Sequence, residues 1–134
     1  RIAPSARSRA FRRRVGGGAD GTAWTDANNN KPISAANVIV VYANHVTDCT
    51  IQENPLGTDP DCKTPGQFSI QIQIWGDGPV QIFRDGKVQS GRWVRANPAD
   101  MLTFVGPDGK PLPLKRGNSW FQMVPLDTQT QVEP

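Results

Sequence analysis

Short apolar runs separated by turn-forming residues dominate this chain. The strongest run, "NVIVVYANHV" at 37–46, is rich in β-branched residues on both alternating faces. A strand that is apolar on both faces is typically central and covered on both sides. The run "FSIQIQIW" at 68–75 instead alternates, which predicts one buried face and one wet face of Ser and Gln side chains. The expected buried face consists of Phe68, Ile70, Ile72 and Ile74.

Asp-Gly pairs mark the second half of the chain. Such a pair between apolar runs favours a tight hairpin turn, because both turn residues must accept a positive φ. We expect hairpins that turn at Asp85–Gly86 and at Asp108–Gly109. A third pair begins at Asp77, which we also interpret as a turn residue. The run 119–126 is the last predicted strand.

These elements predict an all-β fold, either a small antiparallel sheet or sandwich or a partly open barrel, with about seven short strands joined by Asp-Gly hairpins. The 134 residues fit one domain, and thirteen Gly and twelve Pro leave little room for long helices. We divide the chain 1–134 into a basic segment at 1–9, a folded core at 10–126 that starts with a strand at 10–15, and a polar tail at 127–134.

The positive net charge is concentrated at the start of the chain. Six of the fifteen basic residues precede residue 15, and nine remain against twelve acidic residues over the rest. A nucleic-acid-binding face usually spreads Lys and Arg over the folded surface. We therefore expect no nucleic-acid partner, and we interpret Arg12–Arg13–Arg14 as a solvated strand or a contact with an acidic neighbouring domain rather than a site for phosphates or anionic lipid.

The two cysteines, Cys49 and Cys62, flank one polar, Pro- and Gly-containing loop. This arrangement favours a local disulfide, which implies an oxidising compartment. The alternative is two free thiols in a cytosolic protein. A zinc site is disfavoured, because two thiols and a single His do not supply four ligands.

Candidate catalytic and metal-binding residues are few. The only His, His45, lies in the most apolar strand, where a strand residue is a simpler interpretation than a general base. The sequence contains no motif for a nucleophile, a nucleotide or a catalytic metal. We therefore assign no catalytic, cofactor-binding or metal-binding residue. Four carboxylates near the cysteines are interpreted as a solvated loop rather than a Ca²⁺ site; they are Asp48, Glu53, Asp59 and Asp61.

Trp24, Trp75, Trp93 and Trp120 are numerous for a chain of this size. Exposed Trp can stack on sugars or bases, but in small β domains it usually belongs to the core. We predict that Trp93 and Trp120 are mostly buried, and that Gly91 leaves room beside the Trp93 ring. No run of eighteen apolar residues occurs, so we expect no membrane-spanning helix. The opening "RIAPSARSRAF" lacks an initiator Met, and we interpret the chain as part of a longer protein.

Three segments together resemble a family. They are "FRRRVGGGADGTAWTDANNNKPISAANVIVVYANH", "WGDGPVQIFRDGKVQSGRWVR" and "FVGPDGKPLPLKRGNSWFQMVP". In this order they are similar to the C-terminal domain of the YerB-like bacterial lipoproteins, over residues 11–125. The loop between the cysteines is not part of the shared pattern. The matching positions are interpreted as turn and core residues; they are Gly76, Gly78, Asp85, Gly86, Gly91, Trp93, Gly109, Gly117, Trp120 and Pro125.

The resemblance implies an extracytoplasmic, membrane-anchored bacterial protein with a lipid anchor and an N-terminal domain outside this chain. That N-terminal domain and an envelope partner are the expected partners. The resemblance supplies no catalytic residue. Two hypotheses follow: a non-catalytic binding or scaffolding module, or part of an envelope enzyme whose active site needs the N-terminal domain.

Overall fold

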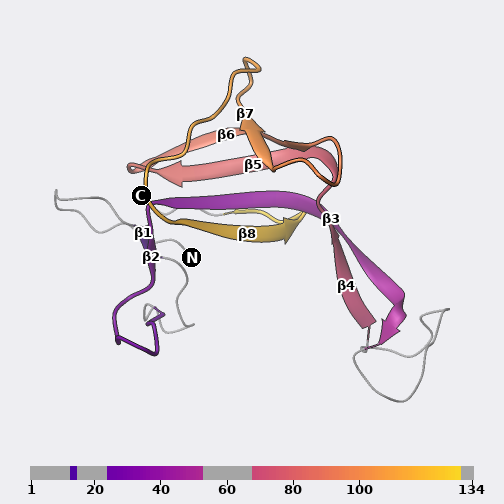
Figure 1. The fold of residues 1–134 in the computed structure, drawn as a ribbon, viewed down its shortest axis with the longest axis horizontal. Helices are drawn as coiled ribbons and strands as arrows, with labels where there is room; N and C mark the ends of the chain where they lie inside the picture. Colours follow the sequence, from indigo (N-terminus) through magenta and orange to yellow (C-terminus); the bar gives the residue numbers. More distant parts are fainter. Residues whose placement is uncertain (1–12, 15–23, 53–67, 131–134) are drawn as a thin grey trace.

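The computed structural model describes residues 13–14, 24–52 and 68–130. These residues form eight strands and no helix (Figure 1), so the all-β prediction is confirmed. The strands are β1 Arg13–Arg14, β2 Ser34–Ala35, β3 Asn37–Gln52, β4 Phe68–Gln73, β5 Gly76–Arg84, β6 Lys87–Arg95, β7 Thr103–Val105 and β8 Ser119–Pro125. Within the described residues no helix has the length and apolar character needed to cross a membrane.

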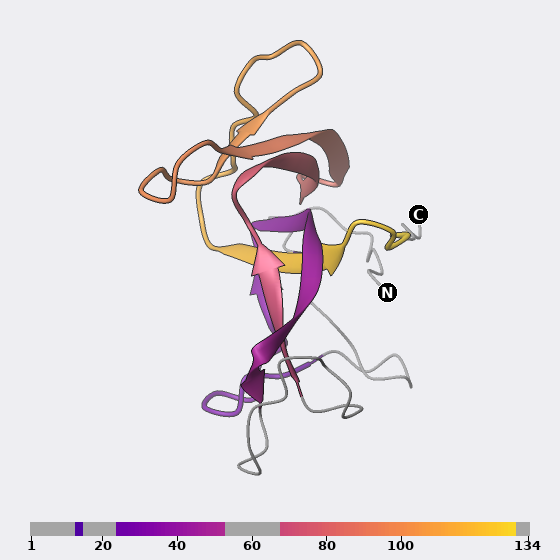
Figure 2. The same cartoon turned by 90° about the vertical axis from the view of Figure 1, so that its right-hand side faces the viewer.

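Six strands form one curled sheet around the long strand β3. The path of the sheet is β4-β3-β5-β6-β7, and β8 also pairs with β3. All of these pairs are antiparallel except β3 with β8, which run parallel from Asn37↔Ser119 to Ala43↔Pro125. Figure 2 shows β5 and β6 curling over β3 and β8. The predicted antiparallel sheet is therefore mixed at its central strand.

The first half of β3 is the centre of the domain, as its two apolar faces predicted. On one face Ile39 and Val41 belong to a buried cluster with Val80, Ile82, Ala43, Trp93 and Phe104. On the other face Val38 and Val40 pack in a second buried cluster with Ala35, Tyr42 and Phe83. Because side chains alternate along a strand, one run of β-branched residues supplies both clusters.

Two of the three Asp-Gly pairs form turns. Asp85 and Gly86 have φ values of 50° and 73° and close the hairpin between β5 and β6 at Arg84↔Lys87, which is the type I′ geometry that Asp-Gly favours. Gly109, with a φ of 74°, lies in the turn after β7. There the predicted return strand is reduced to a single bridge, Val105↔Pro111.

The third pair was predicted wrongly, because Asp77–Gly78 lies inside β5. The chain changes direction just before it, at Gly76, which has a φ of 85°. Gly78 is opposite Trp93 in the register with β6. The glycine therefore makes room for an aromatic ring on the neighbouring strand rather than for a turn.

At the start of the chain, the predicted strand 10–15 is described only at Arg13–Arg14, which pairs with β2. Phe11, Arg12 and Val15 lie outside the described residues. Near the C-terminus, β8 ends at Pro125 and the tail folds back, because the Thr130 hydroxyl lies 2.8 Å from the buried Tyr42 hydroxyl.

Candidate functional site

Large apolar side chains fill the interior of the curled sheet, with Trp93 at its centre. Trp93 is only 2% exposed, as predicted, and its indole N–H donates a 2.8 Å hydrogen bond to the carbonyl oxygen of Tyr42. A Cβ atom added at Gly78 would lie 2.6 Å from Trp93 Nε1. Gly78 is therefore the glycine that accommodates the ring.

The predicted role of Gly91 beside Trp93 is wrong. A Cβ atom at Gly91 would lie 2.2 Å from the carbonyl oxygen of Val105 and 2.6 Å from Leu112. Gly91 thus permits a close approach of the segment around β7 to β6. Both glycines therefore permit close packing between neighbouring segments.

A two-stranded ribbon projects from one end of the sheet. This projecting ribbon consists of residues 44–52 of β3 paired with β4, in the register His45↔Ile72 and Thr47↔Ile70 (Figure 1). Ile74, which follows β4, packs against the buried cluster that contains Trp93. Ile70 and Ile72 share the face of Ile74 by alternation, but they are exposed, Ile70 by 56%. The prediction of a buried Phe68–Ile74 face is therefore wrong for its middle residues.

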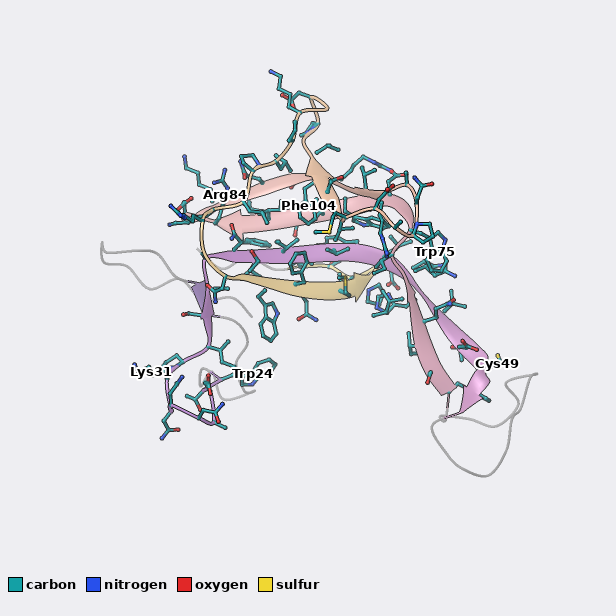
Figure 3. The ribbon with its side chains drawn as sticks, viewed as in Figure 1. Trp24, Lys31, Cys49, Trp75, Arg84 and Phe104 are labelled. Carbon is teal, nitrogen blue, oxygen red and sulfur yellow. The ribbon has the colours of Figure 1, made fainter. Side chains whose placement is uncertain are left out.

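The four Trp residues do not form a common binding platform. Trp93 is buried, Trp120 is half-buried against the cluster of Val38 and Phe83, and Trp24 and Trp75 are 50% and 51% exposed. Trp120 is less completely buried than Trp93, in line with the prediction that it is mostly buried. Figure 3 shows Trp24 and Trp75 well apart, with Trp24 below the sheet and Trp75 at the base of the projecting ribbon. A single sugar ring could not stack on both Trp24 and Trp75.

The turn beside Trp24 is stabilised by its own side chains. Asp26 accepts hydrogen bonds from the backbone N–H of Asn28 at 2.8 Å and from the side-chain amide of Asn29 at 3.2 Å. Asn30 has a φ of 56°, which Asn tolerates well. Turn geometry accounts for these polar residues without a ligand.

His45 lies in β3, half-buried, with its Nδ1 atom 3.0 Å from the carbonyl oxygen of Ala43. Its cross-strand neighbour is Ile72, which cannot act as a nucleophile or an orienting carboxylate. Within residues 13–14, 24–52 and 68–130, no three His, Cys, Asp or Glu side chains are grouped as a metal site would require. Of the predicted acidic loop, Asp48 belongs to β3, while Glu53, Asp59 and Asp61 lie outside the described residues.

Cys49 lies near the far end of the projecting ribbon (Figure 3). Its predicted partner Cys62 lies outside the described residues. The Cys49–Cys62 disulfide therefore stays a prediction, and its place is now specific: it would close the loop at the tip of the ribbon.

The aspartates of two Asp-Gly pairs, Asp77 in β5 and Asp85 in the hairpin turn, are engaged in surface ion pairs. Asp77 pairs with Arg92, and Asp85 pairs with Lys115 and lies 3.7 Å from Arg84. The hydrogen bond from Lys115 lowers the pKa of Asp85, against a smaller opposing effect of desolvation. A carboxylate held ionised in this way stabilises its turn and is poorly suited to donate a proton.

Sequence reasoning missed the main exposed feature of the domain, which is the apolar surface of the projecting ribbon. Val46 is exposed on the Gln side of the ribbon, in register with Gln71, and Ile70, Ile72 and Trp75 are exposed as well. The alternation in 68–74 marks Ile70 and Ile72 as one apolar face, but the sequence has no signal that this face stays exposed. The structure thus defines an all-β domain with a tightly filled interior and a protruding apolar ribbon.

The chain belongs to the family described as "Protein of unknown function (DUF3048) C-terminal domain", whose model matches residues 6–121. The resemblance found in the sequence is thereby confirmed.

Among solved structures, the chain is similar to the crystal structure of YerB protein from Bacillus subtilis, with 26% sequence identity and a TM-score of 0.58. The match covers 87% of this chain and 33% of the YerB chain, so this domain spans about a third of that relative. No curated protein sequence matches the chain.

Proposed function

We propose that this domain is a non-catalytic binding or scaffolding module of a bacterial envelope lipoprotein, located outside the cytoplasm. The observation behind the binding role is the projecting ribbon, on which Ile70 and Ile72 of β4 are exposed by 56% and 37%. Exposed apolar side chains that cluster on one element are typical of protein interaction surfaces.

The extracytoplasmic location rests on different observations. The relative YerB is a bacterial protein with a domain of the same fold, and the sequence resembles bacterial lipoproteins. A disulfide between Cys49 and Cys62 would require an oxidising compartment. The lipid anchor would lie outside this chain.

Protease accessibility in the native bacterium tests the location. Intact cells or spheroplasts are treated with an external protease, and the domain is followed by immunoblot with a cytosolic protein as control. We expect the domain to sediment with membranes and to be digested while the control survives. Protection of the domain equal to that of the cytosolic control contradicts the proposal.

A further inference from the structure

Basic residues gather at the end of the sheet that lies opposite the projecting ribbon. At this end the β5–β6 turn carries Arg84 and Lys87, which are paired in register. Figure 3 shows Arg84 at this end, well away from Cys49 on the ribbon. Figure 1 places β1, β2 and the start of β3 at the same end as the β5–β6 turn.

Polar contacts bring three separate segments together here. The side chain of Asn118, in the loop ahead of β8, donates a 2.8 Å hydrogen bond to the carbonyl oxygen of Ser34. Ser34 of β2 is in register with Arg14 of β1. In the same loop, Lys115 forms an ion pair with Asp85 of the β5–β6 turn. We call this surface the basic end; its segments are 13–14, 84–87 and 115–116.

The basic end has six cations and a single carboxylate. The cations are Arg13, Arg14, Arg84, Lys87, Lys115 and Arg116. Asp85 is the one acidic residue in the three segments. The rest of the described residues contain four basic residues against six Asp. Two of those four cations are paired, Arg92 with Asp77 and Lys110 with Asp108. Positive charge is therefore concentrated at the basic end.

The one carboxylate is shared by two of the cations. Arg84 lies 3.7 Å from Asp85 and donates a 3.0 Å hydrogen bond to Gln89, and Lys115 is the second partner of Asp85. Lys87 and Arg116 are exposed, and among the described residues neither forms an ion pair. The basic end therefore presents positive charge to solvent without an internal counter-charge.

The chemistry of the basic end favours a layer of lipid headgroups over a folded partner. Its three segments contain no apolar or aromatic side chain. Protein interfaces usually have an apolar centre, and single-stranded nucleic acid is bound by aromatic residues that stack on its bases. A layer of anionic headgroups requires neither, because its negative surface potential attracts basic residues directly.

We infer that the basic end lies against a membrane surface that contains anionic phospholipid. The sequence alone favoured a solvated strand for Arg13 and Arg14, because it could not show that four further cations share their end of the sheet. The inference rests on the proposed membrane anchorage, since a lipid chain combined with a basic patch holds a protein at a bilayer more stably than either alone. The projecting ribbon extends from the opposite end and stays free to bind a partner.

Sedimentation with vesicles tests the inference on the 134-residue chain. Vesicles of phosphatidylglycerol mixed with phosphatidylcholine are compared with vesicles of phosphatidylcholine alone. We expect the partition coefficient to be higher for the anionic vesicles by about a hundredfold or more. Most of this preference should disappear in 1 M salt, where the Debye length falls to about 3 Å.

Two double variants separate the basic end from net charge. Lys87→Gln combined with Arg116→Gln removes two exposed cations of the basic end, and the partition coefficient should fall by about tenfold or more. Arg92→Gln combined with Lys110→Gln changes the net charge equally but lies outside the basic end, and it should retain binding within about twofold. Equal thermal unfolding midpoints show that the variants are folded; where they differ, the lipid and salt dependence of the unsubstituted protein decides.

Equal binding of the unsubstituted protein to both kinds of vesicle overturns the inference. A fall of the same size in both double variants also overturns it, because net charge would then be the cause. Binding that Lys87→Gln with Arg116→Gln leaves unchanged does so as well, and assigns the attraction to the basic residues of segment 1–12.

Inorganic polyphosphate is the soluble comparison. Tighter binding to polyphosphate than to the anionic vesicles, at equal phosphate concentration, overturns the inference and assigns the basic end to a soluble polyanion. None of these results depends on the protease experiment in cells, so failure of this inference and failure of the proposed location are distinguishable.

Discussion

At the scale of single residues, the most constrained position is the contact between Gly78 and Trp93. The indole is fixed by its hydrogen bond to the Tyr42 carbonyl and lies over a glycine in the neighbouring strand. Asn37 is similarly constrained, because it is fully buried. Its side chain accepts a 2.7 Å hydrogen bond from the Lys115 N–H and donates a 2.9 Å hydrogen bond to the Lys115 carbonyl oxygen. Residues with buried partners of this kind tolerate little change.

Gly78→Ala should destabilise the domain by about 1–3 kcal/mol, because the new methyl group would overlap a ring that cannot move. The added Cβ atom would lie 2.6 Å from Trp93 Nε1 and 2.8 Å from Cε2. Urea unfolding gives the free energy. In a Trp93→Leu background the same substitution should cost clearly less; an equal cost in both backgrounds would show that the ring is not the cause.

The Lys115–Asp85 contact should appear in the pH dependence of stability. Because the folded-state pKa of Asp85 is lowered, the ionised form stabilises the fold above the unfolded pKa of about 3.9. This contribution is lost as the pH falls through the lower folded pKa. Lys115→Met should raise the Asp85 pKa toward its ordinary value in a carbon NMR titration of the carboxyl group. Lys110→Met, which removes the partner of Asp108, should leave the Asp85 titration unchanged.

At the scale of elements, β3 performs two different tasks. Its first half is enclosed by β5 and β8, and its second half leaves the core to pair with β4 in the projecting ribbon. The ribbon register shifts between Asp48 and Gln52, so pairing is less regular toward the tip. Cys49 lies within this irregular stretch, so a disulfide there would stabilise the least regular part of the ribbon.

We expect Cys49 and Cys62 to be alkylated only after reduction, as measured by intact mass. In the chain-entropy model, closing a loop of about 14 residues stabilises a fold by about 3 kcal/mol. Reduction should therefore accelerate hydrogen exchange in β4 and leave the amides of β5 protected. Two thiols that react without reductant in the natively purified protein would remove the disulfide and weaken the argument for an oxidising compartment.

At the scale of the whole molecule, the sheet closes on itself through side chains. Buried Phe104 of β7 contacts the partly exposed Phe121 of β8, with ring centroids 6.3 Å apart and planes tilted by 32°. β7 is the last strand of the sheet path, whereas β8 lies off that path beside β3, and the two strands are not paired with each other. An aromatic contact replaces the hydrogen bonds that would complete a closed barrel.

A double-mutant cycle with Phe104→Leu and Phe121→Leu should give a coupling of about 0.5–1.5 kcal/mol, typical of an aromatic pair. Denaturant unfolding of the four proteins supplies the values. Replacing Val88 by Ala in place of the Phe121 change is the matched control, since Val88 is exposed on β6. Coupling no larger than in that control would show that β7 and β8 do not stabilise each other.

Local chemistry explains which features were predictable from the sequence. The Asp85–Gly86 hairpin depends on two adjacent residues, and the central strand depends on one apolar run, so both were predicted. Asp77–Gly78 has the same local sequence signal, but Gly78 is required by the Trp93 ring on the neighbouring strand and not by a turn. Alternation in 68–75 showed which face of β4 is apolar, but it could not show whether anything covers Ile70 and Ile72.

The parallel contact between β3 and β8 has a consequence for the order in which the chain can fold. Asn37 and Ser119, which start this pairing, are 82 residues apart and are joined by a side-chain hydrogen bond of 3.1 Å. Among the described strands, one edge of the first half of β3 therefore has no partner until β8 has been synthesised, near the end of the domain. Contacts between distant residues slow folding, because a long loop must be closed before they form. A nascent chain that contains β3 but not yet β8 would leave the apolar segment 37–43 with an unpaired edge. Pairing with β8 would therefore protect this segment from aggregation.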